Sequence, residues 1–226
     1  MQLFITDEMQ VSNEKIIVSE KRIINQLKKV LRAKTGYKFF IQHKTYKNIQ
    51  KRYYCEILEI KETILAKVLE VKEKQIILPE KWIICSVLNK FDKMELIVQK
   101  LTELAVPIIW FVPTSRSIFK KIPPKKLERF YKILLEATEQ SFWWFLPQIK
   151  IYNSLDELPS NIWILNFNWK SIKNLNVDFL LIWPEWWFTE KDIEKIKPKD
   201  CFKLTNTVLR SETASILAGY ELVKNL

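Results

Sequence analysis

The sequence predicts an α/β protein in two parts, a small β-rich domain over residues 1–75 and a larger domain over residues 76–226. Short apolar runs separated by polar residues dominate the first part, which is typical of strands. In the second part, similar runs alternate with long segments whose apolar residues recur every three or four positions, as in amphipathic helices. This alternation favours a sheet of parallel strands covered by helices.

Residues 1–75 are expected to form a small β-barrel-like domain with one helix. Strands are predicted over residues 2–6, 15–18, 38–42, 53–60 and 63–71. The helix between the second and third strands has an apolar stripe made of Ile23, Ile24, Leu27, Val30 and Leu31. Ser19 is a suitable N-cap, because its hydroxyl can accept a hydrogen bond from the first turn. Gly36 is expected to end this helix.

Residues 76–226 contain four predicted helices. The first has a stripe made of Met94, Ile97, Val98, Leu101, Leu104 and Ala105, and it stops before Pro107. Pro123 and Pro124 can open the second, whose stripe is Leu127, Phe130, Tyr131, Leu134, Ala137, Thr138 and Ser141. Thr189 and Asp192 resemble an N-cap and its acidic N3 partner at the start of a short helix, and a final helix covers residues 211–224. Strands are predicted over residues 108–112, 148–152, 162–166, 179–183 and 201–204.

The composition indicates a basic protein. A formal net charge of +11 and a pI near 9.4 suggest a polyanionic partner, most simply RNA or DNA. The same excess of lysine can follow from AT-biased coding, and it would then say nothing about a partner.

Several classes of protein are excluded or disfavoured. Cys55, Cys85 and Cys201 are odd in number and widely spaced, which fits reduced thiols better than disulfides or a zinc site. His43 is the only histidine, so a Ser-His-Asp triad would have to use it, and a His-rich metal site is excluded. The first residues, MQLFITDE, lack the basic start of a signal peptide, and no apolar run approaches the ~20 residues of a membrane span. We therefore expect a cytoplasmic protein that needs no metal.

Glycine and tryptophan occur in unusual numbers. Average usage of about 7% would give roughly 16 glycines, whereas the chain has 2 Gly and 9 Trp. Three of the tryptophans, Trp183, Trp186 and Trp187, fall within the run IWPEWWFT at residues 182–189. Glycine permits positive φ and a close backbone approach, while tryptophan has the largest side chain, so the difference decides what fits beside this loop.

Five segments together resemble one family. They are residues 28–36 (KKVLRAKTG), 93–105 (KMELIVQKLTELA), 115–117 (SRS), 136–141 (EATEQS), and 182–189 followed by 206–214 (NTVLRSETA). In this order and spacing they resemble the RsmE family, the 16S ribosomal RNA uracil-N3 methyltransferases of the SPOUT superfamily. The resemblance covers nearly the whole chain. Each motif alone is weak, but the set is specific.

The resemblance implies a fold, a cofactor and a partner. The family has an N-terminal PUA-like RNA-binding barrel and a C-terminal α/β domain tied in a trefoil knot. It forms homodimers and binds S-adenosylmethionine in the knot. The domains expected here are therefore a PUA-like barrel over residues 1–75 and a SPOUT methyltransferase domain over residues 76–226.

The chain departs from the family at the cofactor loop. The family reads Gly-Pro-Glu-Gly-Gly-Phe where this chain has Trp183, Pro184, Glu185, Trp186, Trp187 and Phe188, and Thr205 stands where the family has glycine. Because methyl transfer needs the donor held close to its acceptor, bulky indoles in this loop should abolish cofactor binding. We hypothesise that the tryptophans at 183, 186 and 187 are glycine in the native protein, encoded by UGA codons that some bacteria read as glycine. The alternative is a degenerate homologue with a filled pocket.

Three residues are candidates for catalysis. Glu185 could orient the cofactor or the target base, although it could equally be a solvated carboxylate. Arg210 and Glu212, at the start of the last helix, could place a uracil that has left its helix stack. Their alternative interpretation is a surface ion pair beside a capping Ser211. The uracil N3 proton must pass to a base or to solvent, and Glu212 is only a candidate acceptor.

Other residues are candidates for binding. The cofactor would contact Leu165, Asn166, Trp183, Pro184, Glu185, Trp186, Leu204, Thr205, Val208 and Leu209, several of which could be plain core. RNA would contact Lys28, Lys29, Arg32, Arg116, Arg129, Gln140 and Arg210, although basic runs are often only solvated faces.

Three functions are compatible with these observations. The first is S-adenosylmethionine-dependent methylation of uridine N3 in small-subunit ribosomal RNA. The second is a catalytically silent RNA-binding protein whose pocket is blocked by genuine tryptophans. The third keeps the fold but moves the methyl group to a ribose 2′-oxygen.

Overall fold

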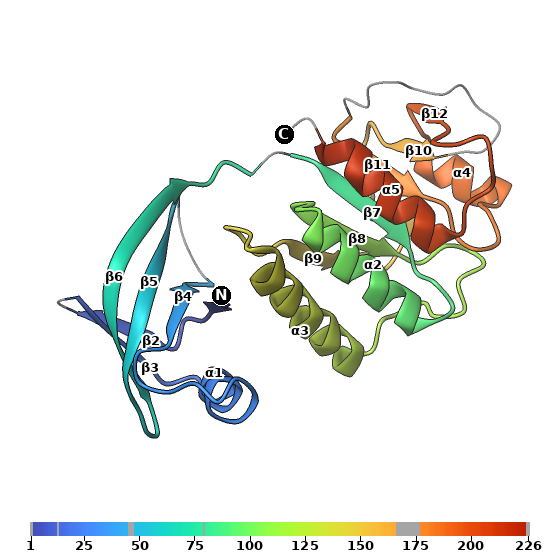
Figure 1. The fold of residues 1–226 in the computed structure, drawn as a ribbon. Helices are drawn as coiled ribbons and strands as arrows, with labels where there is room; N and C mark the ends of the chain where they lie inside the picture. Colours follow the sequence, from blue (N-terminus) through green and yellow to red (C-terminus); the bar gives the residue numbers. More distant parts are fainter. Residues whose placement is uncertain (1, 13, 45–47, 79, 166–176, 225–226) are drawn as a thin grey trace. The chain divides into compact units, whose positions relative to one another are not determined.

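The computed structural model describes residues 2–12, 14–44, 48–78, 80–165 and 177–224. It divides into two compact units (Figure 1). Unit 1 comprises residues 1–77 together with 138–145, and unit 2 comprises residues 78–137 and 146–226. Within the described residues, no helix is long and apolar enough to cross a membrane.

Unit 1 is built on a curled sheet of six strands in the order β1-β4-β5-β6-β3-β2. All neighbours are antiparallel except β1 and β4. Register shifts interrupt the pairing of the two longest strands after Tyr54 and after Ile57, and such bulges increase the twist that lets a sheet curl. The strands are β1 (Leu3–Ile5), β2 (Met9–Ser12), β3 (Lys15–Val18), β4 (Lys38–Gln42), β5 (Ile49–Ile60) and β6 (Ile64–Gln75).

The helix of unit 1 is shorter than the sequence predicts. It consists of α1 (Lys21–Asn25) and a π-helical continuation, η1 (Gln26–Val30). Ile23, Ile24 and Leu27 are buried as expected, but Val30 is 73% exposed and Leu31 36% exposed, so the predicted stripe ends a turn early.

Both predicted ends of this helix are also wrong. Glu20 occupies the N-cap without a side-chain cap bond, while the Ser19 hydroxyl donates to the Glu8 carbonyl. At the other end, Leu31 is the C-cap and Arg32 takes a positive φ of 48°. Gly36 has a φ of 88° in the later turn before β4, so glycine serves that turn and not the helix end.

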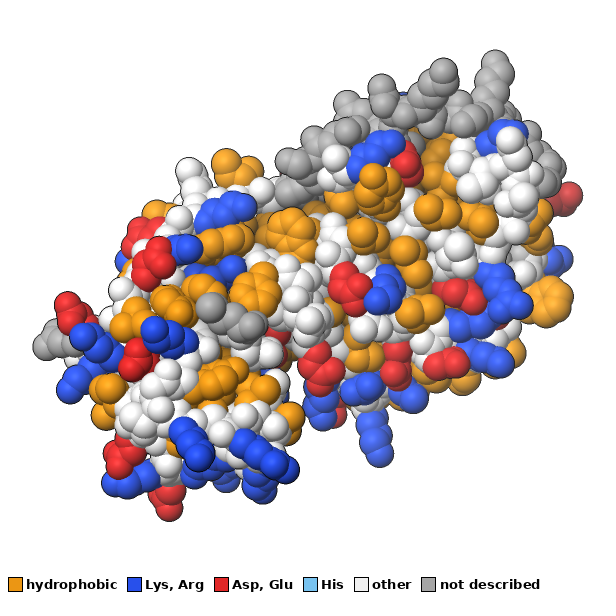
Figure 2. Space-filling model, in the orientation of Figure 1, with side chains coloured by type: hydrophobic (Ala, Val, Ile, Leu, Met, Phe, Trp, Pro, Cys, Tyr) orange, Lys and Arg blue, Asp and Glu red, His pale blue; other side chains and the backbone are white. Residues whose placement is uncertain are grey.

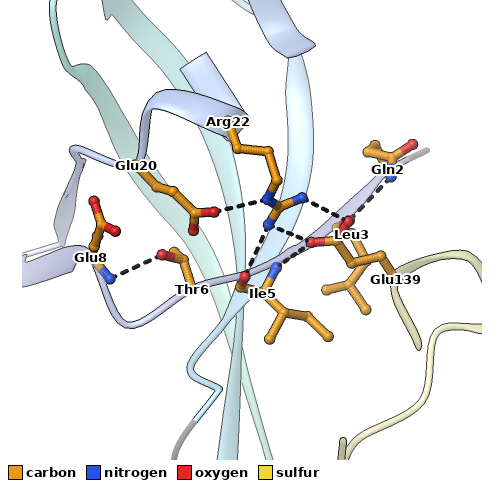
Figure 3. Close-up of polar contacts among 8 residues, drawn as sticks. All are labelled: Gln2, Leu3, Ile5, Thr6, Glu8, Glu20, Arg22 and Glu139. Carbon is orange, nitrogen blue, oxygen red and sulfur yellow. Dashed lines mark hydrogen bonds and ion pairs between the residues drawn. The ribbon is translucent and has the colours of Figure 1, made fainter. Parts of the chain in front are cut away.

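An ion pair between a buried carboxylate and a partly exposed arginine fixes the end of α3 (Pro124–Ser141) inside unit 1 (Figure 3). The Arg22 guanidinium donates to both carboxylate oxygens of Glu139, at 2.9 and 3.1 Å, and also to the Ile5 carbonyl and to Glu20. The Ile5 N–H donates to Glu139 Oε1 at 2.9 Å. Burial raises the pKa of Glu139, although the hydrogen bonds from Arg22 act against this shift. The motif at residues 136–141 therefore has a structural role that its sequence did not suggest.

A second arginine contacts the segment that follows α3. Arg52 donates to the carbonyls of Phe142 and Trp143, and its guanidinium lies 4.0 Å from the centre of the Trp144 ring. Burial lowers its pKa to about 10. Residues 138–145 thus contact the rest of unit 1 through Arg22 and Arg52.

Unit 2 is built on a sheet of six parallel strands in the order β12-β10-β11-β7-β8-β9. They are β7 (Trp82–Ser86), β8 (Ile108–Val112), β9 (Gln148–Ile151), β10 (Trp163–Leu165), β11 (Phe179–Ile182) and β12 (Asp200–Phe202). Their apolar runs are typical of strands whose two faces are both covered. The α/β class and the parallel sheet are confirmed, and β2 and β7 are strands that the sequence analysis missed.

The helices of unit 2 agree with the sequence pattern except at single positions: the helix at residues 91–103 ends before Leu104 and Ala105 of its predicted stripe, and Tyr131 of the next stripe is 48% exposed. The helices are α2 (Phe91–Glu103), most of α3, α4 (Glu190–Ile196) and α5 (Ser211–Val223), with a short 3-10 helix, η2, at Leu155–Glu157. Helices α2 and α5 pack together, and a Cβ on Gly219 would lie 2.3 Å from Leu101 Cδ2, so glycine permits this close approach.

Candidate functional site

The site lies at the carboxyl ends of the neighbouring strands β7 and β11, where ligands commonly bind in α/β sheets. Ser86, the last residue of β7, donates from its hydroxyl to the Ile182 carbonyl at 2.9 Å. Ser211, the first residue of α5, donates to the Trp183 carbonyl at 2.7 Å. These two buried bonds fix the end of β11 and the start of the loop that follows it, the first to the end of β7 and the second to the first turn of α5. Arg210 is the N-cap of α5, so Ser211 does not cap this helix as the alternative interpretation of Arg210 and Glu212 assumes.

A cavity of about 520 Å³ opens beside this loop. Three segments line it: the start of α2, the loop after β11 and the entry to α5. The lining residues are Asn89, Lys90, Lys93, Trp183, Glu185, Trp186, Trp187, Val208, Leu209, Arg210, Ser211 and Glu212. All three candidate catalytic residues, Glu185, Arg210 and Glu212, are therefore brought to one cavity.

Lys93 holds the two carboxylates of the cavity together. Its Nζ lies 2.5 Å from Glu185 Oε1 and 3.7 Å from Glu212 Oε2. The hydrogen bond to Glu185 raises the pKa of Lys93. The Asn89 N–H also donates to Glu185 at 3.4 Å. Glu212 Oε2 is buried and has no hydrogen-bond partner among the described residues, because Lys93 lies just beyond hydrogen-bond distance.

Sequence reasoning did not single out Lys93, Asn89 or Lys90. Lys93 begins the first motif of unit 2, but helical periodicity places it off the apolar stripe, where a lysine is normally solvated. Its carboxylate partners are 92 and 119 residues further along the chain, and no local pattern reveals such a contact.

The tryptophans of the loop differ in how they are placed. Trp183 is 6% exposed, whereas Trp186 is 63% and Trp187 40% exposed. The rings of Trp183 and Trp187 stack with their centres 5.3 Å apart. Trp187 has a φ of 62°, a left-handed conformation that favours glycine. The indole of Trp183 therefore takes up space inside the loop, and that of Trp186 extends mostly into solvent.

The carboxylate of Asp192, on α4, connects the end of the loop after β11 to the loop after β8. Asp192 accepts hydrogen bonds from the N–H and hydroxyl groups of both Thr189 and Ser115. The first set completes the predicted capping box of α4, and the second holds the Ser115-Arg116-Ser117 motif. Arg116 in turn donates to the Trp186 carbonyl at 2.5 Å. The motif is therefore connected to the candidate cofactor loop.

Four of the remaining candidate cofactor residues do not line the cavity. Leu165 is buried at the end of β10, and Pro184 is buried within the loop. Leu204 packs against the core of unit 2, and the Thr205 hydroxyl donates to the Thr207 carbonyl. Trp183, Glu185, Trp186, Val208 and Leu209 line the cavity, while Leu165, Pro184, Leu204 and Thr205 are not among its lining residues. Asn166 lies outside the described residues.

The candidate RNA-binding residues are exposed but belong to both units. Lys28, Lys29, Arg32 and Gln140 belong to unit 1, and Arg116, Arg129 and Arg210 belong to unit 2. Among the described residues, two of these side chains besides Arg116 have a partner: Lys28 donates to the Lys61 carbonyl, and Arg129 Nε lies 3.5 Å from Glu95.

Comparison with known proteins gives consistent matches. Residues 77–220 match the family described as RNA methyltransferase domain. The chain is similar to ribosomal RNA small subunit methyltransferase E of Bacillus subtilis, with 29% identity over 189 residues, which are 73% of this chain and 74% of that protein. It is also similar to ribosomal RNA small subunit methyltransferase E 2 of Borreliella burgdorferi, with 28% identity over 96% of this chain and 94% of that protein.

The fold is similar to a solved structure as well. Ribosomal RNA small subunit methyltransferase E from Neisseria gonorrhoeae, bound to S-adenosyl methionine, aligns with a TM-score of 0.76 at 22% identity. The alignment covers 97% of this chain and 95% of that chain. At this level of identity the likeness concerns the fold.

Proposed function

Because the chain belongs to the RNA methyltransferase domain family, we propose that it methylates N3 of a uridine in the 16S RNA of the small ribosomal subunit, with S-adenosylmethionine as the methyl donor. One observation carries this proposal. Every residue that lines the cavity lies within the residues that match the family. The names of the similar proteins support small-subunit ribosomal RNA as the substrate, the resemblance to the RsmE family supports N3 of uridine as the target, and the cofactor of the Neisseria protein supports the donor.

The cavity suits this cofactor in size and chemistry. Its volume of about 520 Å³ falls within the roughly 300–1,000 Å³ of small-molecule sites. Apolar walls from Val208 and Leu209 suit a nucleoside, and the cluster around Lys93 suits an amino acid group. The loop at residues 183–187 and the turn at residues 204–209 would hold the cofactor, with Leu165 and Asn166 at its other edge. When bound, it supplies a methyl group on a positively charged sulfur.

The charged residues have separate roles in this proposal. Lys93 holds Glu185 and Glu212 toward the cavity, and Arg210 binds the phosphate of a uridine that has left its helix stack. Glu212 accepts the N3 proton as the new nitrogen–carbon bond forms, because its Oε2 has no hydrogen-bond partner among the described residues. Glu185 orients the bound ligands.

The proposal includes glycine at positions 183, 186 and 187 of the native protein. The positive φ of Trp187 supports glycine there, and the buried indole of Trp183 takes up room that a ligand would use. The mass of the peptide covering residues 173–191, measured on protein from the native host, decides between the two residue types. A mass that fits tryptophan would favour the silent RNA-binding homologue.

The activity is tested with two proteins, the chain as printed and a variant with Trp183→Gly, Trp186→Gly and Trp187→Gly. Calorimetry measures binding of S-adenosylmethionine, and nuclease digestion with mass spectrometry identifies the methylated atom in small ribosomal subunits. We expect the glycine variant to bind the cofactor and to produce N3-methyluridine. A ribose 2′-O-methyl product, or no cofactor binding by either protein, would contradict the proposal.

The family resemblance also supports wider proposals about the molecule. They are that residues 1–75 act as a PUA-like RNA-binding barrel, that residues 76–226 form a knotted SPOUT domain, and that two copies form a homodimer in the cytoplasm. Sedimentation equilibrium tests the dimer directly.

A further inference from the structure

A second cavity of unit 2 combines an aromatic ring with basic side chains. It has a volume of about 460 Å³ and is lined by Phe91, Glu95, Pro123, Lys125, Lys126 and Arg129. It lies between the start of α2 and the first turns of α3. None of its lining residues belongs to the candidate cofactor site, although α2 contributes side chains to both cavities.

The aromatic ring is held in place and remains partly accessible. Phe91 is half-buried, and its ring packs against Phe119 with centres 4.7 Å apart and planes inclined by 38°. Lys126 Nζ lies 5.2 Å from the centre of the Phe91 ring. This arrangement offers a rigid apolar surface next to a cation, which is the combination that binds a nucleotide by stacking its base and contacting its phosphate.

The charge around the cavity is mainly positive. Glu95 is the one acid among the lining residues, and it is paired with Arg129 at 3.5 Å. Among the described residues, neither Lys125 nor Lys126 forms an ion pair. Figure 2 shows basic side chains gathered near the start of α3 on the face drawn. Two lysines beside a stacking surface are therefore available to an anionic ligand.

We propose that this cavity binds one nucleotide of single-stranded RNA, with its base stacked on Phe91 and its phosphate held by Lys125 and Lys126. The inference rests on the proposed function for the identity of the polymer, and it adds a site for a nucleotide other than the one that is methylated. Stacking tolerates any base, so the site contributes affinity without sequence selectivity.

The test measures binding of a radiolabelled short oligouridine over a range of salt concentrations, without S-adenosylmethionine. Phe91→Leu should raise the dissociation constant about fivefold or more and leave the salt dependence unchanged, because it removes a stacking ring but no charge. Lys126→Gln should weaken binding and reduce the slope of log affinity against log salt by about one. Phe91→Tyr keeps the ring and should bind like the parent chain.

Lys191→Gln, on an exposed position of α4, is the charge-matched control. An equal loss from this control would mean that net charge alone binds RNA, and it would overturn the proposal. Unchanged binding by Phe91→Leu, in a protein whose thermal unfolding matches that of Phe91→Tyr, would also overturn it. Photocrosslinking of 5-iodouridine RNA should label Phe91, and a pattern of labels that omits Phe91 would place the nucleotide outside this cavity. Because the assay contains no cofactor, it can succeed even if methyl transfer fails.

Discussion

Trp187 is a residue whose backbone and side chain have conflicting preferences. Its φ of 62° belongs to the left-handed region, where an L side chain costs about 1–2 kcal/mol. It is the one tryptophan with positive φ among the described residues. The stacking of its ring on Trp183 offsets part of this cost, since such pairs are worth about 0.5–1.5 kcal/mol beyond burial. The backbone therefore favours glycine even though the chain carries an indole.

Comparing Trp187→Gly with Trp187→Ala isolates this backbone effect. Both changes remove the indole and its stacking, so their difference reports the cost of a Cβ at positive φ. We expect the glycine variant to be more stable by about 1 kcal/mol, measured by urea unfolding.

Position 186 provides the matched control, because Trp186 does not have a positive φ. There, Trp186→Ala should be as stable as Trp186→Gly or more stable by up to about 1 kcal/mol, because alanine leaves the unfolded chain fewer conformations. An advantage for glycine of the same size at both positions would mean that the effect does not come from φ.

At the scale of elements, Asp192 joins α4 to the loop after β8. It is fully buried and accepts hydrogen bonds from Thr189 and Ser115. Burial acts to raise the pKa of this carboxyl, but the hydrogen bonds outweigh burial and lower it. The capping box is evident from the sequence, because Thr189 and Asp192 have the required spacing. The bonds to Ser115 are not, because Ser115 lies 77 residues away.

Asp192→Asn should destabilise the protein by about 1–3 kcal/mol at neutral pH, because the amide brings N–H groups against the donors that faced a carboxylate. The folded pKa of Asp192 lies below the unfolded value. Asp192 therefore makes its full contribution to the stability of the folded protein above its unfolded pKa, and this contribution is lost as the pH falls through its folded pKa. Urea unfolding of parent and variant should give stabilities that converge below about pH 4.

Asp200→Asn, at an exposed position on β12, is the control and should stay within about 0.5 kcal/mol of the parent chain. A constant difference between Asp192→Asn and the parent from neutral to acid pH would show that the charge of Asp192 is not the cause.

At the scale of the whole molecule, local patterns predict the elements better than they predict the contacts between them. Periodicity predicts α2 and α3, and the family match together with the similar small-subunit methyltransferases confirms the motif resemblance to RsmE proteins. A short apolar run such as β7 has no periodicity that separates a strand from buried coil, so it was missed. The contacts of Lys93 with Glu185 and of Arg22 with Glu139 join distant parts of the sequence, and they appear only once the chain is folded.

The pair of Arg22 and Glu139 helps to hold residues 138–145 in unit 1. The Glu139 side chain is 4% exposed and the Arg22 side chain 32% exposed. Arg22→Met would leave a buried carboxylate with only the Ile5 N–H as a partner. We expect a loss of about 2–3 kcal/mol at neutral pH, below the roughly 3–5 kcal/mol of fully buried pairs because Arg22 is partly solvated. Lys38→Met, which breaks the exposed pair with Glu56, should cost less than about 1 kcal/mol.

The loss in Arg22→Met should also shrink in acid, as for Asp192→Asn, but for a different reason: here the variant loses stability as the pH rises, whereas with Asp192 the parent chain loses stability as the pH falls. Burial raises the pKa of Glu139 in the folded protein above its unfolded value, and removing Arg22 strengthens this effect. The Arg22→Met variant therefore keeps its full stability below the unfolded pKa of Glu139, at about 4.3, and loses stability as the pH rises through the folded pKa of Glu139. Chemical unfolding from pH 4 to pH 7 should show the stability of the variant approaching that of the parent chain in acid.

Adding Glu139→Gln should remove most of this pH dependence, because a neutral amide keeps an acceptor for Ile5 and has no charge to bury. A loss that stayed the same across this range would mean that packing around Arg22, and not the charge of Glu139, holds residues 138–145 in unit 1.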